Sequence, residues 1–150
     1  MWQDKLNEIV KEKQIYKEKI NVGALEDEIQ LFKRYVIKEL NVNLPVEYLN
    51  ILKTVNGIEF NGFIFYGIDE SILQRIPNQK INGLVENNKI WLENEWLQKY
   101  IFLGESNISW YVYHNENKKY YELDNPSGRE IEEFSCLENL LEKLLSDSLL

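Results

Sequence analysis

The side chains best suited to covalent catalysis are scarce in this sequence of 150 residues, which has one histidine, His114, and one cysteine, Cys136. A serine or cysteine nucleophile needs a base beside it and a third group that orients the base. His114 lies late in a predicted strand with no such partner, so we interpret it as a surface or hydrogen-bonded residue. Cys136 begins a predicted helix, and we interpret it as a packed thiol.

The sequence gives no better support for a metal site or for an acid/base catalytic site. There is no cysteine pair, no His-x-x-x-His or Glu-x-x-His spacing, and no calcium-binding loop pattern. Two acidic pairs, Glu93 with Glu95 and Glu105 with Asp124, would suit glycosidase-type chemistry if folding brought them together. With 25 acidic residues in the chain, such pairs arise by chance. We therefore expect no enzyme activity, no metal and no cofactor.

The charge balance favours a protein partner over a nucleic acid. The chain has 17 basic and 25 acidic residues, a formal net charge of −8. Nucleic-acid binding normally depends on concentrated positive charge, so direct binding to DNA or RNA is disfavoured. The same negative charge would attract a basic protein and speed its encounter. The alternative is that the excess of glutamate only keeps the protein soluble.

Nothing in the sequence indicates export or a membrane. The N-terminal residues have no apolar signal-peptide region, and no stretch approaches the roughly 18 apolar residues of a membrane helix. One cysteine excludes an internal disulfide and fits a reducing compartment. We expect a cytoplasmic protein without membrane contact.

Helical patterns dominate the first third of the chain. Residues 1–22 carry apolar side chains at spacings of three, four or seven, which predicts an amphipathic helix that ends at Gly23. A second apolar stripe over residues 25–40 predicts another helix. Leu44-Pro45 then indicates the start of a short third helix, and Asn56-Gly57 indicates its end.

The period then changes to that of strands. Asn61-Gly62 between two short apolar runs is a strong type I′ hairpin signal. Residues 69–82 predict a long surface loop or a short helix, and residues 84–100 fit a helix better than a strand. Four β-type runs follow, as in an antiparallel meander: 100–103, 109–114, 119–123 and 130–134. A capping box at 135–138 and a leucine stripe predict a final helix, so the chain is expected to form one α+β domain over residues 1–150.

Aromatic residues concentrate on two neighbouring strands of the predicted meander. They alternate with polar residues, and the set comprises Trp110, Tyr111, Tyr113, Tyr120 and Tyr121. One interpretation is cross-strand pairing that fills the core. The other is that some of them are exposed anchors, since tyrosine and tryptophan dominate the energetic hot spots of protein interfaces.

Several short motifs occur in a characteristic order along the chain. They are Leu44-Pro45, Tyr48, Leu52, Asn56-Gly57, Asn61-Gly62-Phe63, Leu103-Gly104-Glu105-Ser106, Trp110-Tyr111, Tyr113, Asp124, Pro126 and Ser127-Gly128. Together they resemble the SUKH superfamily, and more narrowly a YrhA-like member related to the Smi/Knr cell-wall-assembly regulator family. The resemblance covers residues 25–145, so the amphipathic stretch 1–22 lies outside it.

The resemblance implies a fold in which N-terminal helices and a C-terminal helix surround a bent antiparallel sheet, here of about five to six strands. It also implies an immunity protein that binds and neutralises a bacterial toxin, such as a nuclease or another polymorphic or contact-dependent toxin domain. No catalytic residues come with it. The alternatives are a regulatory scaffold that recruits the cell's own proteins and an acid/base hydrolase.

The expected partner is therefore a cognate toxin domain with a basic surface, and the oligomeric state is left open. Acidic residues that flank predicted loops and turns are the candidate contacts, with two aromatic residues of the meander. The set is Asp69, Glu70, Glu93, Glu95, Glu105, Asp124, Trp110 and Tyr113.

Overall fold

Five α-helices and one six-stranded antiparallel sheet make up the computed structural model, which describes residues 1–150. The helices are α1 (Trp2–Ile15), α2 (Glu26–Leu40), α3 (Val46–Leu52), α4 (Leu84–Trp91) and α5 (Leu137–Ser148), with short 3-10 helices η1 (Glu70–Ile72) and η2 (Glu95–Leu97). The strands are β1 (Ile58–Phe60), β2 (Phe63–Phe65), β3 (Tyr100–Glu105), β4 (Ser109–His114), β5 (Tyr120–Asp124) and β6 (Glu130–Phe134). The predicted α+β class is confirmed.

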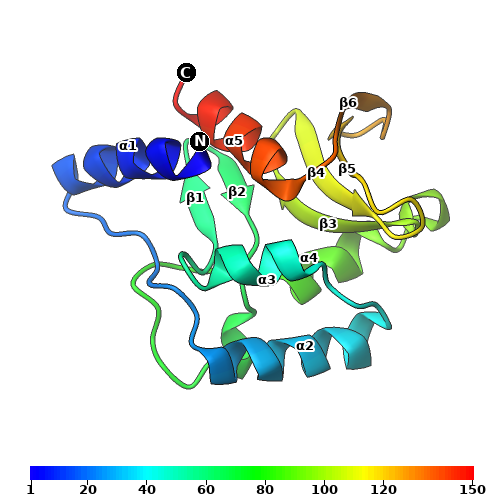
Figure 1. The fold of residues 1–150 in the computed structure, drawn as a ribbon, viewed down its shortest axis with the longest axis horizontal. Coiled ribbons are helices and arrows are strands. Elements are labelled where there is room, and N and C mark those ends of the chain that lie inside the picture. The colour runs from blue at the N-terminus through cyan, green and yellow to red at the C-terminus, as the bar shows by residue number, and fades with distance from the viewer.

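The sheet is a meander in which each strand pairs with the next, from β1 to β6. The β1–β2 turn contains the expected Asn61-Gly62, and both residues have positive φ, 50° and 81°, as a type I′ turn requires. Register shifts occur between Phe102 and Gly104 on β3 and between Glu122 and Leu123 on β5. Such bulges increase the local twist, and the strands of the sheet are visibly curved (Figure 1).

Helices cover both faces of the sheet. On one face α5 contacts β2, β5 and β6, and α1 packs against α5. On the other face α4 contacts β3, and α2 packs against α4. Figure 1 shows α1 and α5 together at the top of the molecule and α2 at the bottom. This layering buries one continuous hydrophobic core.

The first helix ends eight residues earlier than predicted, at Ile15 instead of Gly23. Lys17 adopts a left-handed backbone, φ 58°, that turns the chain away. Residues 18–25 then run without regular structure towards the end of α3, where Ala24 N donates to Leu52 O at 2.7 Å. A Cβ on Gly23 would lie 1.9 Å from the Lys53 carbonyl oxygen. The glycine therefore serves this close backbone approach, which the sequence pattern could not distinguish from a helix stop.

Two other helix boundaries also differ from the predictions. The helix predicted within 84–100 ends at Trp91 and is followed by η2. The final helix is capped by Cys136 instead of Ser135, so the predicted capping box is wrong. The backbone N–H of Leu137 donates instead to Glu47 Oε2 of α3, at 3.1 Å. The carboxylate of Glu47, distant in sequence, thus caps the start of α5 in place of the predicted local capping box.

Candidate functional site

Two of the predicted acidic contacts, Asp69 and Glu70, are engaged in holding the 69–82 loop. Asp69 is 4% exposed, and its carboxylate accepts hydrogen bonds from the backbone N–H groups of Val85 and Glu86, at 3.0 and 2.9 Å. Burial raises its pKa, although these two donors act in the opposite direction. Glu70 is exposed, and its Oε1 accepts from Ile81 N at 2.7 Å. Asp69 therefore caps the first turn of α4 and offers no free surface.

The predicted aromatic anchors, Trp110 and Tyr113, lie in the core. Trp110 is 3% exposed and Tyr113 is 8% exposed. The indole of Trp110 packs on Trp91 of α4 at a centroid distance of 5.3 Å, and the ring of Tyr113 packs on Tyr120 at 5.0 Å. Core filling therefore accounts for both residues, and neither can reach a partner unless the sheet repacks.

Glu105 lies at the end of β3, in register with Trp110 and therefore on the α4 face of the sheet. It is half-buried close to Tyr66, whose hydroxyl accepts a hydrogen bond from Trp91 Nε1 at 3.0 Å. Burial raises the pKa of Glu105, and the neighbouring Tyr66 hydroxyl offsets this only in part. Burial and the Glu105 charge together raise the pKa of Tyr66. The Glu105 carboxyl thus belongs to a polar cluster at one end of the sheet.

The acid pair Glu105 and Asp124 cannot act together on one bond. Asp124 pairs with Ser109, whereas Glu105 pairs with Trp110, the next residue of β4. Side chains of successive strand residues point to opposite faces, so the two carboxylates project from opposite sides of the sheet. Asp124 accepts hydrogen bonds from the Ser127 hydroxyl and amide, which lower its pKa. It stabilises the β5–β6 turn and lacks the converging partner that glycoside hydrolysis requires.

Contacts between three segments nevertheless bring together the parts of the chain that carry four of the predicted acids. Asn125 of the β5–β6 turn hydrogen-bonds to Ser106 O and Ile108 O of the β3–β4 turn. The ring of Trp96 in turn lies against Gly128, because a Cβ there would be 2.1 Å from it. We call these three segments, residues 93–96, 105–108 and 124–129, the turn surface. Glu93, Glu95, Glu105 and Asp124 all belong to it.

Two exposed apolar residues on the turn surface were not among the predicted contacts. Trp96 is 51% exposed and Ile108 is 67% exposed. In the sequence Trp96 resembled part of an amphipathic helix, and only the break between α4 and η2 turns it outward. A large exposed ring beside Glu93 and Glu95 is the composition that interfaces favour, with an apolar anchor inside a charged rim.

His114 and Cys136 have structural surroundings. His114 Nδ1 accepts hydrogen bonds from the amides of Glu116 and Asn117, at 3.2 and 3.3 Å, and so closes the β4–β5 turn. Cys136 is a free, partly buried residue at the start of α5.

No group of three or more His, Cys, Asp and Glu side chains is placed to hold a metal ion. None of the helices is both long and apolar enough to cross a bilayer.

Comparison with known protein families shows to which family this chain belongs. The family model described as SUKH_6, SMI1-KNR4 cell-wall, matches residues 26–141, from the start of α2 into α5. This chain belongs to that family. No curated protein matches its sequence.

Membership of the SMI1-KNR4 family places the chain among immunity-type and regulatory domains that are not known as enzymes. The match includes the sheet, α4 and the whole turn surface, and it leaves α1 outside. The helix α1 buries Trp2, Leu6 and Ile9 and packs on α5, so it extends the family core of this SMI1-KNR4 protein.

Proposed function

We propose that this SMI1-KNR4 protein is an immunity protein that binds and neutralises a cognate bacterial toxin domain in the cytoplasm. The observation that carries the proposal is the exposed Trp96, held against Gly128 and flanked by Glu93 and Glu95, on a protein of this immunity-type family. An exposed indole next to two acidic residues suits a partner with a basic rim and an apolar pocket. Toxins that act on nucleic acids carry such basic surfaces.

The mechanism is occlusion. Trp96 and Ile108 enter an apolar hollow of the toxin, while the neighbouring carboxylates meet the cationic side chains that would otherwise hold the substrate. A total interface of about 1,600 Å² is sufficient for a specific complex of this kind. The toxin is blocked because its cleft is covered and its charge is neutralised, and no bond is made or broken by the immunity protein.

A growth-rescue experiment tests the proposal. Each toxin C-terminal domain encoded beside this gene is expressed with and without the protein, and growth is measured. We expect one of them to be neutralised and to co-purify, with an association rate that falls as salt rises. Absence of rescue by any neighbouring toxin, together with capture of the cell's own envelope or signalling proteins, would favour the regulatory scaffold instead.

A further inference from the structure

The outer edge of strand β6 has no neighbouring strand. It is the last in the order β1 to β6, and its residues from Glu130 to Glu133 are all exposed. An edge strand presents unpaired backbone N–H and C=O groups, and these can pair with another extended chain. The opposite edge, β1, is only three residues long, and its Phe60 ring lies under Lys13 of α1 with the ammonium 5.9 Å from the ring centre. The β6 edge is therefore the longer and more open of the two.

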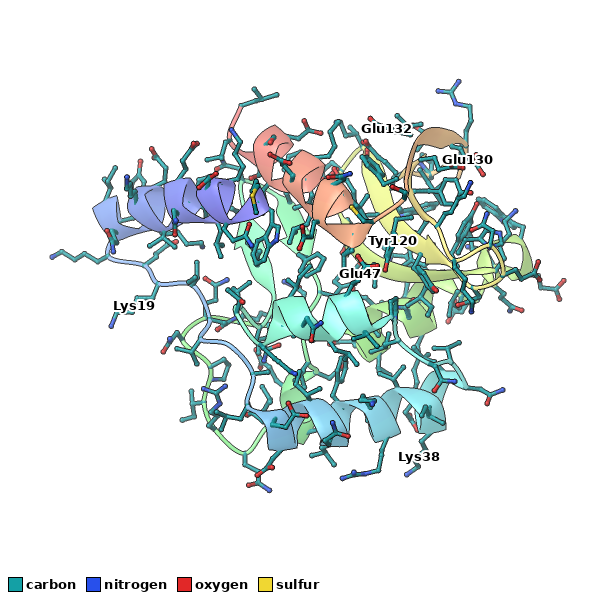
Figure 2. The ribbon with its side chains drawn as sticks, in the orientation of Figure 1. Lys19, Lys38, Glu47, Tyr120, Glu130 and Glu132 are labelled. Carbon is teal, nitrogen blue, oxygen red and sulfur yellow. The ribbon has the colours of Figure 1, made fainter.

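The β6 edge is strongly acidic. Glu133 is partnered, since it accepts from Lys119 Nζ and from the Tyr121 hydroxyl, each at 3.2 Å. Neither Glu130 nor Glu132 forms an ion pair. Figure 2 shows both of these side chains on β6, while the labelled Lys19 and Lys38 lie elsewhere on the molecule. Two negative charges on this edge thus lack a cation.

A buried carboxylate behind this edge also lacks part of its hydrogen bonding. Glu122 of β5 lies directly across from Glu132 and is 4% exposed. Its Oε2 accepts from the Ser109 hydroxyl at 2.6 Å, but its Oε1 accepts no hydrogen bond. Lys143 Nζ forms a salt bridge with this Oε1 at 3.5 Å and also hydrogen-bonds to Asp147. Glu122 thus already has its cation, and Glu132, directly across from it, is the carboxylate of this face that still lacks one.

A groove lies beside Glu132. It has a volume of about 510 Å³ and lies between β6 and α5, where its lining includes Glu132, Phe134, Asn139, Lys143 and Ser146. Because cross-strand neighbours share a face, Glu122 and Glu132 both project from the α5 side of the sheet, on which the groove opens. Ile131 is skipped at the bulge and remains 49% exposed. The edge therefore combines free backbone groups, unpaired acids and one apolar contact.

We propose that β6 is the docking edge for an extended cationic segment of the protein partner. The segment adds to the six-stranded sheet as a further strand, and one of its lysine or arginine side chains lies beside Glu132 at the groove. Main-chain hydrogen bonds supply affinity in this mode, and the alternate side chains supply specificity. A second copy of this chain is a poor occupant, because two acidic edges would repel each other. The inference rests on the proposed function, since it names a second region of the toxin-binding surface.

A short peptide tests the edge directly. The probe is acetyl-Lys-Val-Arg-Val-Lys-Val-amide, compared with the same peptide N-methylated at its central backbone nitrogens, which keeps the charge but removes the donors for strand pairing. Binding to the full chain is followed by amide NMR shifts and by amide hydrogen exchange. We expect shifts and slower exchange centred on residues 130–134, and at least tenfold weaker binding of the methylated peptide.

Charge variants complete the test. Glu132→Lys is expected to weaken peptide binding at least tenfold, whereas Glu12→Lys, the same change on the exposed face of α1, leaves it within twofold. Equal binding of the two peptides, shifts centred away from β6, or equal affinity of the two variants would each overturn the proposal. In the rescue experiment, a Glu132→Lys protein that still neutralises the toxin fully removes the β6 inference and leaves the immunity function standing. Failure of the unchanged protein to rescue removes the immunity function itself.

Discussion

The ring of Trp96 lies over Gly128 so closely that a Cβ there would come within 2.1 Å of it. Gly128 also has φ 74°, which side-chain-bearing residues rarely adopt. One glycine thus permits both the β5–β6 turn and the seating of an indole from a segment more than thirty residues earlier. The position of the proposed anchor depends on this contact.

Replacing Gly128 by alanine should lower the free energy of unfolding by more than the backbone strain alone would. We expect about 1 kcal/mol from the left-handed backbone and about 1–3 kcal/mol more from the clash with Trp96. Gly62→Ala is the matched control, because Gly62 has φ 81° with nothing within 4 Å of the added Cβ. Urea unfolding of both variants measures the difference. Equal losses in the two would show that Trp96 does not rest on Gly128.

Glu105 and Glu28 should give opposite pH dependences of stability. Burial raises the pKa of Glu105 above its ordinary 4.5, so in the window above 4.5 the folded state binds more protons than the unfolded state. The free energy of unfolding then falls as pH rises through that window. Glu105→Gln removes this cost, so its stability relative to the unchanged protein should improve from pH 4.5 to pH 7.

Glu28 should make the free energy of unfolding depend on pH in the opposite direction. Arg75 donates to both of its carboxylate oxygens, at 2.8 and 3.0 Å, and lowers its pKa below 4.5. Its stabilisation is therefore present above pH 4.5 and is lost as pH falls through the lowered pKa. Glu28→Gln should cost about 1 kcal/mol at pH 7 and almost nothing at the acid end. Urea unfolding of both variants from pH 3 to pH 7 checks the two slopes, and slopes of the same sign would contradict the assignment.

Asn88 should contribute more to stability than any local pattern suggests. It is fully buried in α4, and its side chain donates to Phe102 O and accepts from Phe102 N, each at 2.8 Å. These bonds satisfy the backbone beside the β3 bulge, so Asn88→Ala leaves a buried donor and acceptor unpaired and should cost about 2–4 kcal/mol. Asn87→Ala is the control, because Asn87 donates only to Gly83 O of its own helix. A loss for Asn88→Ala no larger than that of the control would show that water replaces these bonds.

Local periodicity and turn chemistry were enough to predict most of the elements. The leucine stripe of α5, the Asn61-Gly62 hairpin and the strands of the meander depend on residues close in sequence, so the sequence predicts them. Gly23, Glu47 and Asn88 could not be interpreted this way, because each acts on a segment far along the chain: Lys53, Leu137 and Phe102. The turn surface was only half predicted for the same reason. Its acids were named from their loop positions, whereas the exposure of Trp96 depends on where α4 stops.

The interface role of Trp96 can be measured once the neutralised toxin domain is known. Trp96→Ala should weaken its binding by at least roughly 30-fold, which corresponds to about 2 kcal/mol and to a hot-spot residue. Tyr16→Ala is the matched control, because Tyr16 is an aromatic residue of 74% exposure just beyond α1, outside the turn surface. Calorimetry gives the affinities, and urea unfolding confirms that both variants remain folded. If the two variants bind equally, Trp96 only packs against Gly128 and has no role in binding. The acids around it would then act through long-range charge alone, and their effect would disappear at high salt.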